Sequence, residues 1–516
     1  MITQKFHVLF VTSVSACFEL ENNSVYQSDG TFDVFLNGER VLTDVQTNVF
    51  SLFDLQPNTE YGVSIGEEVV QFMTEKESAC LLATAFGVAA DGVTDDTVAI
   101  QNAIDCCPKY GRVRFPAGKY CFTSLTLKSF ITLELCQGAY LLADPVEAHY
   151  PILPGEITDP TTGEMVQVSS WEGNPFPCRK SILTAFGAEG IRIVGKGVID
   201  GNAQNSTWWE NVKSREIGRP KLCFFNKCED IAIHGITGKN SPCWHFHPFF
   251  SENIRFLDMQ VEAPRISPNT DGINPESCNN VQIVGVRFSV GDDAIAIKSG
   301  KIYMGMKYKT PARNHVIRNC YIEHAHGAVV LGSEMAGGIK ELSVSQCLFV
   351  HTDRGLRIKT RRKRGKYAVV DGVVFSNIQM RNVKAPLVMN MYYNCDPDGN
   401  DKIVWSKEPH PVDDTTPYLG RFVFRDMECT DCEWAAGFFY GLPEQPIESV
   451  LIDNVSFTFK EDATSGYPAL MSYTEKECRL GLYFRFTNQV RLQNVTMEGQ
   501  VGPMLIAQDV KEKCIM

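Results

Sequence analysis

A short pattern of apolar and polar residues recurs from about residue 190 onward. Each copy is a run of apolar residues interrupted by one or two small or polar ones, and copies begin at Ile193, Ile233, Phe256, Ile283, Ile317, Val344, Phe375, Phe424, Ile452 and Leu492. Between 233 and 375 successive copies start 23, 27, 34, 27 and 31 residues apart. One strand-like repeat per coil, with loops of variable length, is typical of an all-β solenoid. Helical periodicity is scarce, which argues against a TIM barrel, and a propeller needs about 40 or more residues per blade.

Residues 1–76 show a different all-β pattern, in which short alternating runs are separated by Asn-Asn, Asp-Gly and Asn-Gly turns. Tyr61 follows Leu55 and Pro57 at a spacing that lets its hydroxyl bond to upstream backbone and fix a corner between two sheets. This stretch resembles a fibronectin type III β-sandwich. We read its first residues as a strand, and not as a cleaved signal peptide, because the apolar run is broken and the alternation continues. Residues 77–81 are predicted to be a linker, and 82–516 a second domain.

One helix is predicted at the start of this second domain. Asp95 or Asp96 would cap it, and Val98, Ile100, Ala103 and Ile104 would form its apolar face. Such a helix would cover the open end of a stack of strands. The longest insertions between repeats fall near 148–182, 303–313 and 395–420, where loops can form the walls of a cleft.

Charge and cysteine content narrow the classes of function. A net charge of −12 argues against a nucleic-acid partner. The 18 cysteines are scattered and show no pair of CxxC motifs, so we expect no zinc site. No other metal and no cofactor is expected. Many scattered thiols favour a reducing, cytoplasmic location, with secretion as the alternative. No apolar run is long enough to span a membrane. No oligomeric state is predicted.

Two acidic blocks carry the candidate chemistry. Asn269-Thr270-Asp271 and Gly291-Asp292-Asp293 place their aspartates 21 residues apart, about one coil. In a solenoid, such positions lie one above the other at about 4.8 Å. Three clustered carboxylates repel one another, so that one can keep a proton while the others ionise, which acid/base cleavage of a glycosidic bond requires. The alternative interpretation is two polar turns between strands.

Cationic side chains follow in later repeats. In Leu356-Arg357-Ile358-Lys359 the alternation predicts that Arg357 and Lys359 lie together on the solvent face, where they suit a sugar carboxylate. Lys298 shares the alternation of Asp292 and is a further candidate for binding substrate. Eight basic residues and no acid occur from 354 to 366, which indicates either a patch that attracts a polyanion or a surface loop.

Four blocks in this order resemble the motifs of glycoside hydrolase family 28, the polygalacturonases and related pectin hydrolases, over roughly residues 82–500. The blocks are Asn269-Thr270-Asp271, Gly291-Asp292-Asp293, His326-Gly327 and Arg357-Ile358-Lys359. Ala325 stands where the family usually has glycine. The resemblance implies a right-handed parallel β-helix that cleaves its substrate with inversion.

The resemblance also assigns roles by position. Asp292 would be the general acid, and Asp271 and Asp293 would activate the attacking water. His326 would hydrogen-bond near the acid, while Arg357 and Lys359 would contact the galacturonate carboxylate.

Two further residues are weighed from the sequence alone. Asn269 is a candidate for holding the water or its base, and His247 a candidate for contacting substrate. Trp244 could stack on a sugar, although core packing is the stronger interpretation.

We therefore expect hydrolysis of α-1,4-galacturonosyl linkages in an acidic oligosaccharide, with an exo mode favoured. A rhamnogalacturonan or xylogalacturonan hydrolase of the same family is the first alternative. A calcium-dependent β-helical lyase and a non-catalytic binding solenoid are the others.

Overall fold

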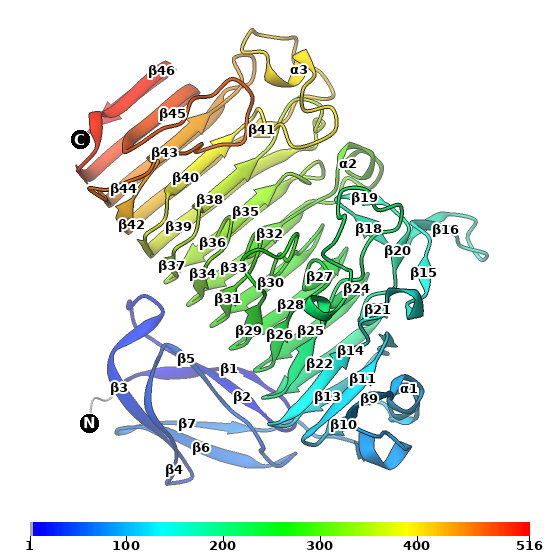
Figure 1. The fold of residues 1–516 in the computed structure, drawn as a ribbon. Coiled ribbons are helices and arrows are strands. Elements are labelled where there is room, and N and C mark those ends of the chain that lie inside the picture. The colour runs from blue at the N-terminus through cyan, green and yellow to red at the C-terminus, as the bar shows by residue number, and fades with distance from the viewer. Residues whose placement is uncertain (1–3) are drawn as a thin grey trace.

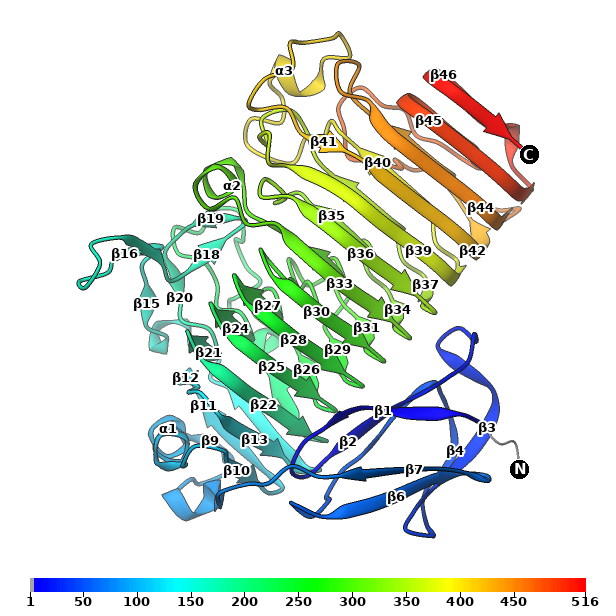
Figure 2. The same ribbon diagram turned by 180° about the vertical axis from the view of Figure 1, so that it is seen from behind.

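The computed structural model describes residues 4–516, which form a small sandwich of strands beside a long coil of parallel strands (Figures 1 and 2). The sandwich pairs a sheet ordered β1-β2-β5 with a sheet ordered β4-β3-β6-β7. Its strands are β1 (Phe6–Val11), β2 (Ala16–Leu20), β3 (Gln27–Leu36), β4 (Glu39–Thr47), β5 (Val49–Leu52), β6 (Glu60–Ile65) and β7 (Glu68–Met73). The predicted small β-sandwich is confirmed, and the first residues described enter strand β1.

Side chains from both sheets fill the core of the sandwich. Phe18 stacks on Phe50 with ring centroids 5.2 Å apart, and Phe72 meets Phe18 edge-on from the other sheet. The hydroxyl of Tyr61 accepts a hydrogen bond of 2.9 Å from the backbone N–H of Gln56. This is the corner predicted from the sequence, and it fixes the chain where it crosses between the sheets.

The sandwich is docked on the flank of the coil through buried polar and apolar contacts. Glu19 accepts two hydrogen bonds of 2.7 Å from the guanidinium of Arg318. The ring of His234 is fully buried between the hydroxyls of Ser15 (3.1 Å) and Ser51 (2.8 Å). The sandwich is therefore fixed against the coil.

The coil consists of three parallel stacks of strands. The first contains β10 (Gly111–Phe115), β13 (Ile131–Leu135), β22 (Glu189–Gly195), β25 (Glu229–His234), β28 (Glu252–Leu257), β30 (Asn279–Val284), β33 (Ala312–Arg318), β36 (Ile339–Ser345), β39 (Val369–Arg381), β42 (Arg421–Cys432) and β44 (Ile447–Phe459). The second contains β11 (Gly118–Phe122), β14 (Ala139–Ala143), β23 (Val198–Asp200), β26 (Thr237–Lys239), β29 (Gln260–Glu262), β31 (Arg287–Ser289), β34 (Tyr321–Glu323) and β37 (Leu348–Val350).

The third stack carries the residues of the candidate site. It contains β12 (Leu125–Thr126), β21 (Leu183–Phe186), β24 (Cys223–Asn226), β27 (Phe246–Phe249), β32 (Ile295–Ile297), β35 (Val329–Gly332), β38 (Arg354–Lys359), β40 (Ala385–Asn390) and β43 (Ala435–Tyr440). The coil opens with β8 (Cys80–Leu82), η1 (Ala83–Phe86) and β9 (Asp91–Asp95), so its first strand includes the last residues of the predicted linker. It closes with β45 (Leu480–Glu498) and β46 (Val501–Ile515). The predicted parallel β-helix is confirmed.

The sequence repeat corresponds to one row of stacked core residues. Ile233, Phe256 and Ile283 pair in parallel register on β25, β28 and β30, and the other repeat starts continue the row in both directions. Two residues after each start the backbone turns through a left-handed conformation, with φ between 43° and 117°. These turn residues are Gly195, Gly235, Asp258, Gly285, Asn319, Gln346, Asn377, Asp426, Asn454 and Asn494. Gly, Asn and Asp tolerate this conformation best, which explains the polar interruption in each copy.

The predicted helix is present as α1 (Thr97–Cys106). Ile100, Ala103 and Ile104 face the core, but Val98 is 70% exposed, so its assignment to the apolar face is wrong. Asp96 precedes the helix without capping it, because its carboxylate accepts hydrogen bonds from the N–H groups of Ala89 and Ala90.

The insertions form structure of their own on the outside of the third stack. The first contains β15 (Ile152–Leu153), β16 (Glu156–Thr158), β17 (Met165–Gln167), β18 (Ser170–Trp171), β19 (Asn174–Pro175) and β20 (Cys178–Arg179). Later insertions contain α2 (Ile302–Tyr308) and α3 (Lys402–Trp405) (Figure 1). Within residues 4–516, no helix combines the length and the apolar character that crossing a membrane would take.

Candidate active site

The two acidic blocks occupy equivalent positions on adjacent coils of the third stack. Ile273 and Ile295 are bridged in parallel register, so Asp271 and Asp293, each two residues earlier, lie one above the other. The backbone N–H of Gly272 donates to the carbonyl of Asp293 over 3.0 Å, which fixes this stacking. Asp292 is the neighbour of Asp293, so the structure brings the three carboxylates together at one point.

These side chains open into a cleft of about 610 Å³ on the outer face of the third stack. The cleft is lined by eight of the nine residues singled out from the sequence, namely Asn269, Asp271, Asp292, Asp293, Lys298, His326, Arg357 and Lys359. Residues not expected from the sequence complete the lining: Glu172, Lys213, Ser333, Glu334, Tyr393, Cys395, Asp396 and Leu470, together with Trp244.

Asp293 is buried between two cations. Lys359 Nζ lies 2.7 Å from one carboxylate oxygen, and Arg357 Nη1 lies 3.3 Å from the other. Burial opposes ionisation of Asp293, but Lys359 and Arg357 outweigh it and hold the pKa of this carboxyl well below its usual range. Asp293 is therefore an ionised carboxylate over the whole physiological range.

Asp271 has the opposite character. Its burial, and then the charge of Asp292, raise the pKa of Asp271 well above the usual value, although Lys298 Nζ lies 3.7 Å away. Both effects oppose ionisation of Asp271, so its proton is released only at a higher pH than from an isolated aspartate.

Asp292 is the most exposed of the three clustered aspartates. Its side chain is 24% exposed, against 5% for Asp271 and 2% for Asp293. His326 Nδ1 lies 3.3 Å from Asp292 Oδ1, and this contact raises the pKa of the imidazole. The backbone N–H of His326 also donates to the carbonyl of Asp292 over 3.0 Å.

Lys298 is enclosed by acids and an aromatic ring. Its ammonium group lies 3.1 Å from Glu334 Oε2 and 4.5 Å from the ring centroid of Trp244. Burial works against the charged form, but Glu334 and Asp271 raise the pKa of Lys298 overall. For Glu334, burial is outweighed by Lys298 and Lys301, so that its pKa falls to about 2.

The family of the chain follows from its relatives. The "Probable polygalacturonase" of Vitis vinifera is 31% identical over 385 residues, which cover 72% of this chain and 72% of that protein. The model of "Glycosyl hydrolases family 28" matches residues 161–404. The chain belongs to glycosyl hydrolase family 28. The resemblance inferred from four sequence motifs is therefore confirmed.

Other comparisons agree with the assignment to family 28. An endo-polygalacturonase of Pectobacterium carotovorum subsp. carotovorum is 28% identical over 335 residues, covering 60% of this chain and 75% of that protein. The family 28 exopolygalacturonase of Yersinia enterocolitica has the same fold, with a TM-score of 0.72 at 20% identity over 99% of both chains. Residues 83–134 match the model "Rhamnogalacturonase A/epimerase, pectate lyase-like".

One of the nine predicted residues does not reach the cleft of this family 28 protein. His247 is fully buried, its Nε2 lies 2.9 Å from Glu276, and its ring meets that of Trp244 at 4.9 Å. The prediction that His247 contacts substrate is wrong, because Trp244 and Phe224 cover it. Trp244, for which core packing is the stronger interpretation, is buried at 3% exposed and also contributes to the lining of the cleft.

Asn269 is held by a residue that sequence reasoning missed. Its backbone is left-handed (φ 56°), and its side-chain oxygen accepts a hydrogen bond of 2.5 Å from Arg219 Nη2. Arg219 is almost fully buried and also donates to the carbonyls of Pro242 and Pro268. It lies some 50 residues before Asn269 on a different coil, so local spacing gave no signal.

The basic run is neither an open patch nor an ordinary surface loop. Arg357 and Lys359 do lie together on the outer face, but they are only 6% and 8% exposed because Asp293 pairs with both. The arginines that follow are buried against acids of the later insertion and β43–β44 loop: Arg361 and Arg364 pair with Asp396, Arg361 also with Asp398, and Arg362 with Glu444.

These arginines fix one wall of the cleft. Asp396 comes from the insertion after β40, and Glu172 comes from the insertion before β21. Lys301 stands between them, 3.0 Å from Asp396 Oδ1 and 3.6 Å from Glu172 Oε2. Two insertions far apart in sequence are thus joined over the same side of the cleft.

Proposed function

We propose that the protein hydrolyses α-1,4-galacturonosyl linkages of pectic oligosaccharides by an inverting, single-displacement mechanism. The observation that carries the proposal is one partly exposed carboxyl, Asp292, beside two buried ones of opposite pKa shift, Asp271 and Asp293. The polygalacturonase names of its relatives support the same substrate class.

The acid and base roles follow from exposure and charge. Asp292 would donate its proton to the glycosidic oxygen, because it is the most exposed of the three carboxyls and lines the cleft. Asp271 and Asp293 would then orient and deprotonate the attacking water, and His326 would stabilise Asp292 once it has become an anion. An inverting site needs its carboxyls about 6.5–9.5 Å apart, with water between the sugar and the base.

An acidic sugar suits the cations of the cleft. Arg357 and Lys359 share one carboxylate, that of Asp293, so one positive charge is left over for a galacturonate carboxylate. Lys213, which is exposed at the rim, makes no ion pair with any residue in the range 4–516.

We further propose an exo mode. The wall formed by Glu172, Lys301 and Asp396 limits the cleft on one side, so that a chain end fits better than the middle of a polymer. A rhamnogalacturonan hydrolase is the second candidate, since residues 83–134 match a model described by that activity.

Product analysis tests these proposals. Purified protein is incubated with tetragalacturonate, and products are separated by chromatography at early times. We expect galacturonate together with trigalacturonate, or digalacturonate alone, at first, and no product from a rhamnogalacturonan. A ladder of internal products would reject the exo mode, and absence of turnover on all galacturonides would reject the substrate. Product that absorbs at 235 nm would indicate a lyase instead.

A further inference from the structure

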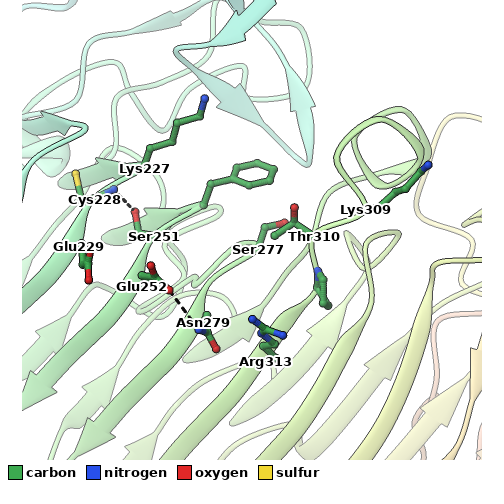
Figure 3. Close-up of a pocket in the computed structure, with 12 residues that line it drawn as sticks. Lys227, Cys228, Glu229, Ser251, Glu252, Ser277, Asn279, Lys309, Thr310 and Arg313 are labelled. Atoms are coloured by element: carbon green, nitrogen blue, oxygen red, sulfur yellow. Dashed lines mark hydrogen bonds between the residues drawn. The ribbon is translucent and has the colours of Figure 1, made fainter.

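A second hollow lies on the flank of the coil, at the corner where the third stack turns into the first (Figure 3). It has a volume of about 400 Å³ and is lined by residues of four segments, 227–229, 250–252, 277–279 and 309–313. The first three segments follow one another on successive coils, since Lys227 N–H donates to Phe249 O and Phe250 N–H to Glu276 O. With about 4.8 Å per coil, the hollow extends over roughly 14 Å along the axis, enough for a short oligosaccharide.

Three cations without a carboxylate partner among residues 4–516 surround this hollow, and the ammonium group of one of them, Lys309, lies 5.4 Å from the ring centroid of Tyr367. Lys227, Lys309 and Arg313 are exposed, and within residues 4–516 none of them forms an ion pair. Figure 3 shows them on separate segments around the hollow. This contrasts with the arginines of the catalytic wall, each of which has a carboxylate partner.

The two acids that line the hollow are already engaged. Glu229 accepts a hydrogen bond from the amide of Asn253, and Glu252 accepts one from the amide of Asn279, each over 3.3 Å. The lining therefore has an excess of one positive charge in a protein whose net charge is −12. Such a local excess attracts an anion.

The chain turns through a left-handed backbone at this corner. Lys227, Phe250 and Ser277 all have left-handed backbones, with φ of 53°, 47° and 53°. Gly187 occupies the same corner one coil earlier, with φ 57°, and its N–H donates to Asn226 O. The same conformation recurs at many other non-glycine turns of this chain, so it is a regular feature of the corner.

Phe250 supplies an aromatic surface. Its ring is half-buried and held edge-on by Phe249 at 4.7 Å and by Tyr308 at 5.1 Å. A uronic acid has C–H groups on its ring, which pack on an aromatic face, and a carboxylate, which pairs with cations. The hollow offers both kinds of contact.

We propose that this hollow is a second, non-catalytic binding site for an acidic oligosaccharide. The choice of a galacturonide as ligand rests on the proposed function, whereas the charge and shape of the hollow do not depend on it. Such a site holds a long substrate at the protein surface between rounds of cleavage.

Calorimetric titration with trigalacturonate tests the proposal. The Asp292→Asn variant is used so that the ligand is not consumed, and maltotriose serves as the neutral-sugar arm. We expect two binding sites for trigalacturonate and no binding of maltotriose at the hollow. Replacing Lys227 and Arg313 by glutamate should remove one site and leave the affinity of the other unchanged, while Lys511→Glu, on the exposed strand β46, should remove none.

A glycine variant separates binding from folding. Lys227→Gly suits the left-handed backbone, so the midpoint of thermal unfolding should stay the same or rise, while affinity at the second site falls about tenfold with the loss of one charged contact. If only one binding site is found and the Lys227 and Arg313 variants leave it intact, the proposal of a second site is rejected and the proposed function stands. Binding at neither site overturns the proposed function as well.

Discussion

Lys298→Met tests the electrostatic design of the cleft. The ammonium group of Lys298 is buried between Glu334 and Asp271, at 3.1 and 3.7 Å. Methionine keeps much of the length and packing of the side chain but removes the charge. Both acids would then lose a cation while staying buried, a change that typically destabilises a protein by about 3–5 kcal/mol.

The pKa of Glu334 gives an independent magnitude. It falls from an ordinary value of 4.5 to about 2 in the folded protein. That difference corresponds to about 3 kcal/mol of folding free energy, to which Lys298 is the largest favourable contributor. Since the folded pKa is the lower one, this stabilisation is present above the unfolded pKa and is lost as the pH falls through the folded pKa. Loss of the cation also raises the pKa of Asp271 further, which destabilises the folded state at neutral pH.

The measurement is the free energy of unfolding in guanidinium, determined for the wild type, for Lys298→Met and for a control. The control is Lys340→Met, whose lysine is exposed on β36. We expect a loss of about 3 kcal/mol at pH 7 that shrinks steadily toward pH 3, and no loss in the control. A cost below about 1 kcal/mol at pH 7, or a cost independent of pH, would refute the reasoning.

Three further predictions follow from other contacts. Asp292→Asn should lower kcat about 10²–10⁴-fold while calorimetry still detects trigalacturonate binding, and unchanged turnover would remove Asp292 from the mechanism. His326→Gln should move one limb of the pH profile of kcat/KM, because a titrating imidazole 3.3 Å from Asp292 is lost. Identical profiles would make His326 purely structural. Arg318→Ala leaves Glu19 buried without its guanidinium partner, so the contact between the sandwich and the coil should weaken. Limited proteolysis should then cut between residues 74 and 79. Arg313→Ala, on the same strand but away from the sandwich, should leave the digestion pattern unchanged.

The sequence predicts the repeating coil, and it also predicts the small sandwich with its corner at Tyr61. The row from Ile233 through Leu492 could be read directly, because each coil must bury the same inward position and turn at the same left-handed residue. The eight predicted residues that line the cleft lie on or beside those regular strands, where alternation decides the direction of a side chain.

The remaining residues come from irregular chain. Glu172, Lys301 and Asp396 lie in or beside insertions, whose paths depend on contacts between distant segments and not on local pattern. His247 is a candidate only because its segment lies one coil before the aspartates, and that placement says nothing about its burial beneath Trp244. Burial of Arg361 and Arg362 was hidden because their acidic partners occur more than 30 residues later.

The docked sandwich has a consequence for how the coil comes apart. Its residues contact successive turns, from Lys196 beside Phe53, through His234 and Arg318, to Gln346 and Asn377, which bond to the chain near residues 22–24. A free solenoid can fray coil by coil from either end, because each coil touches only its neighbours. Here the sandwich contacts several coils that are not neighbours of one another. The central coils that carry the carboxylates should therefore unfold in one cooperative step, after the sandwich has detached from them.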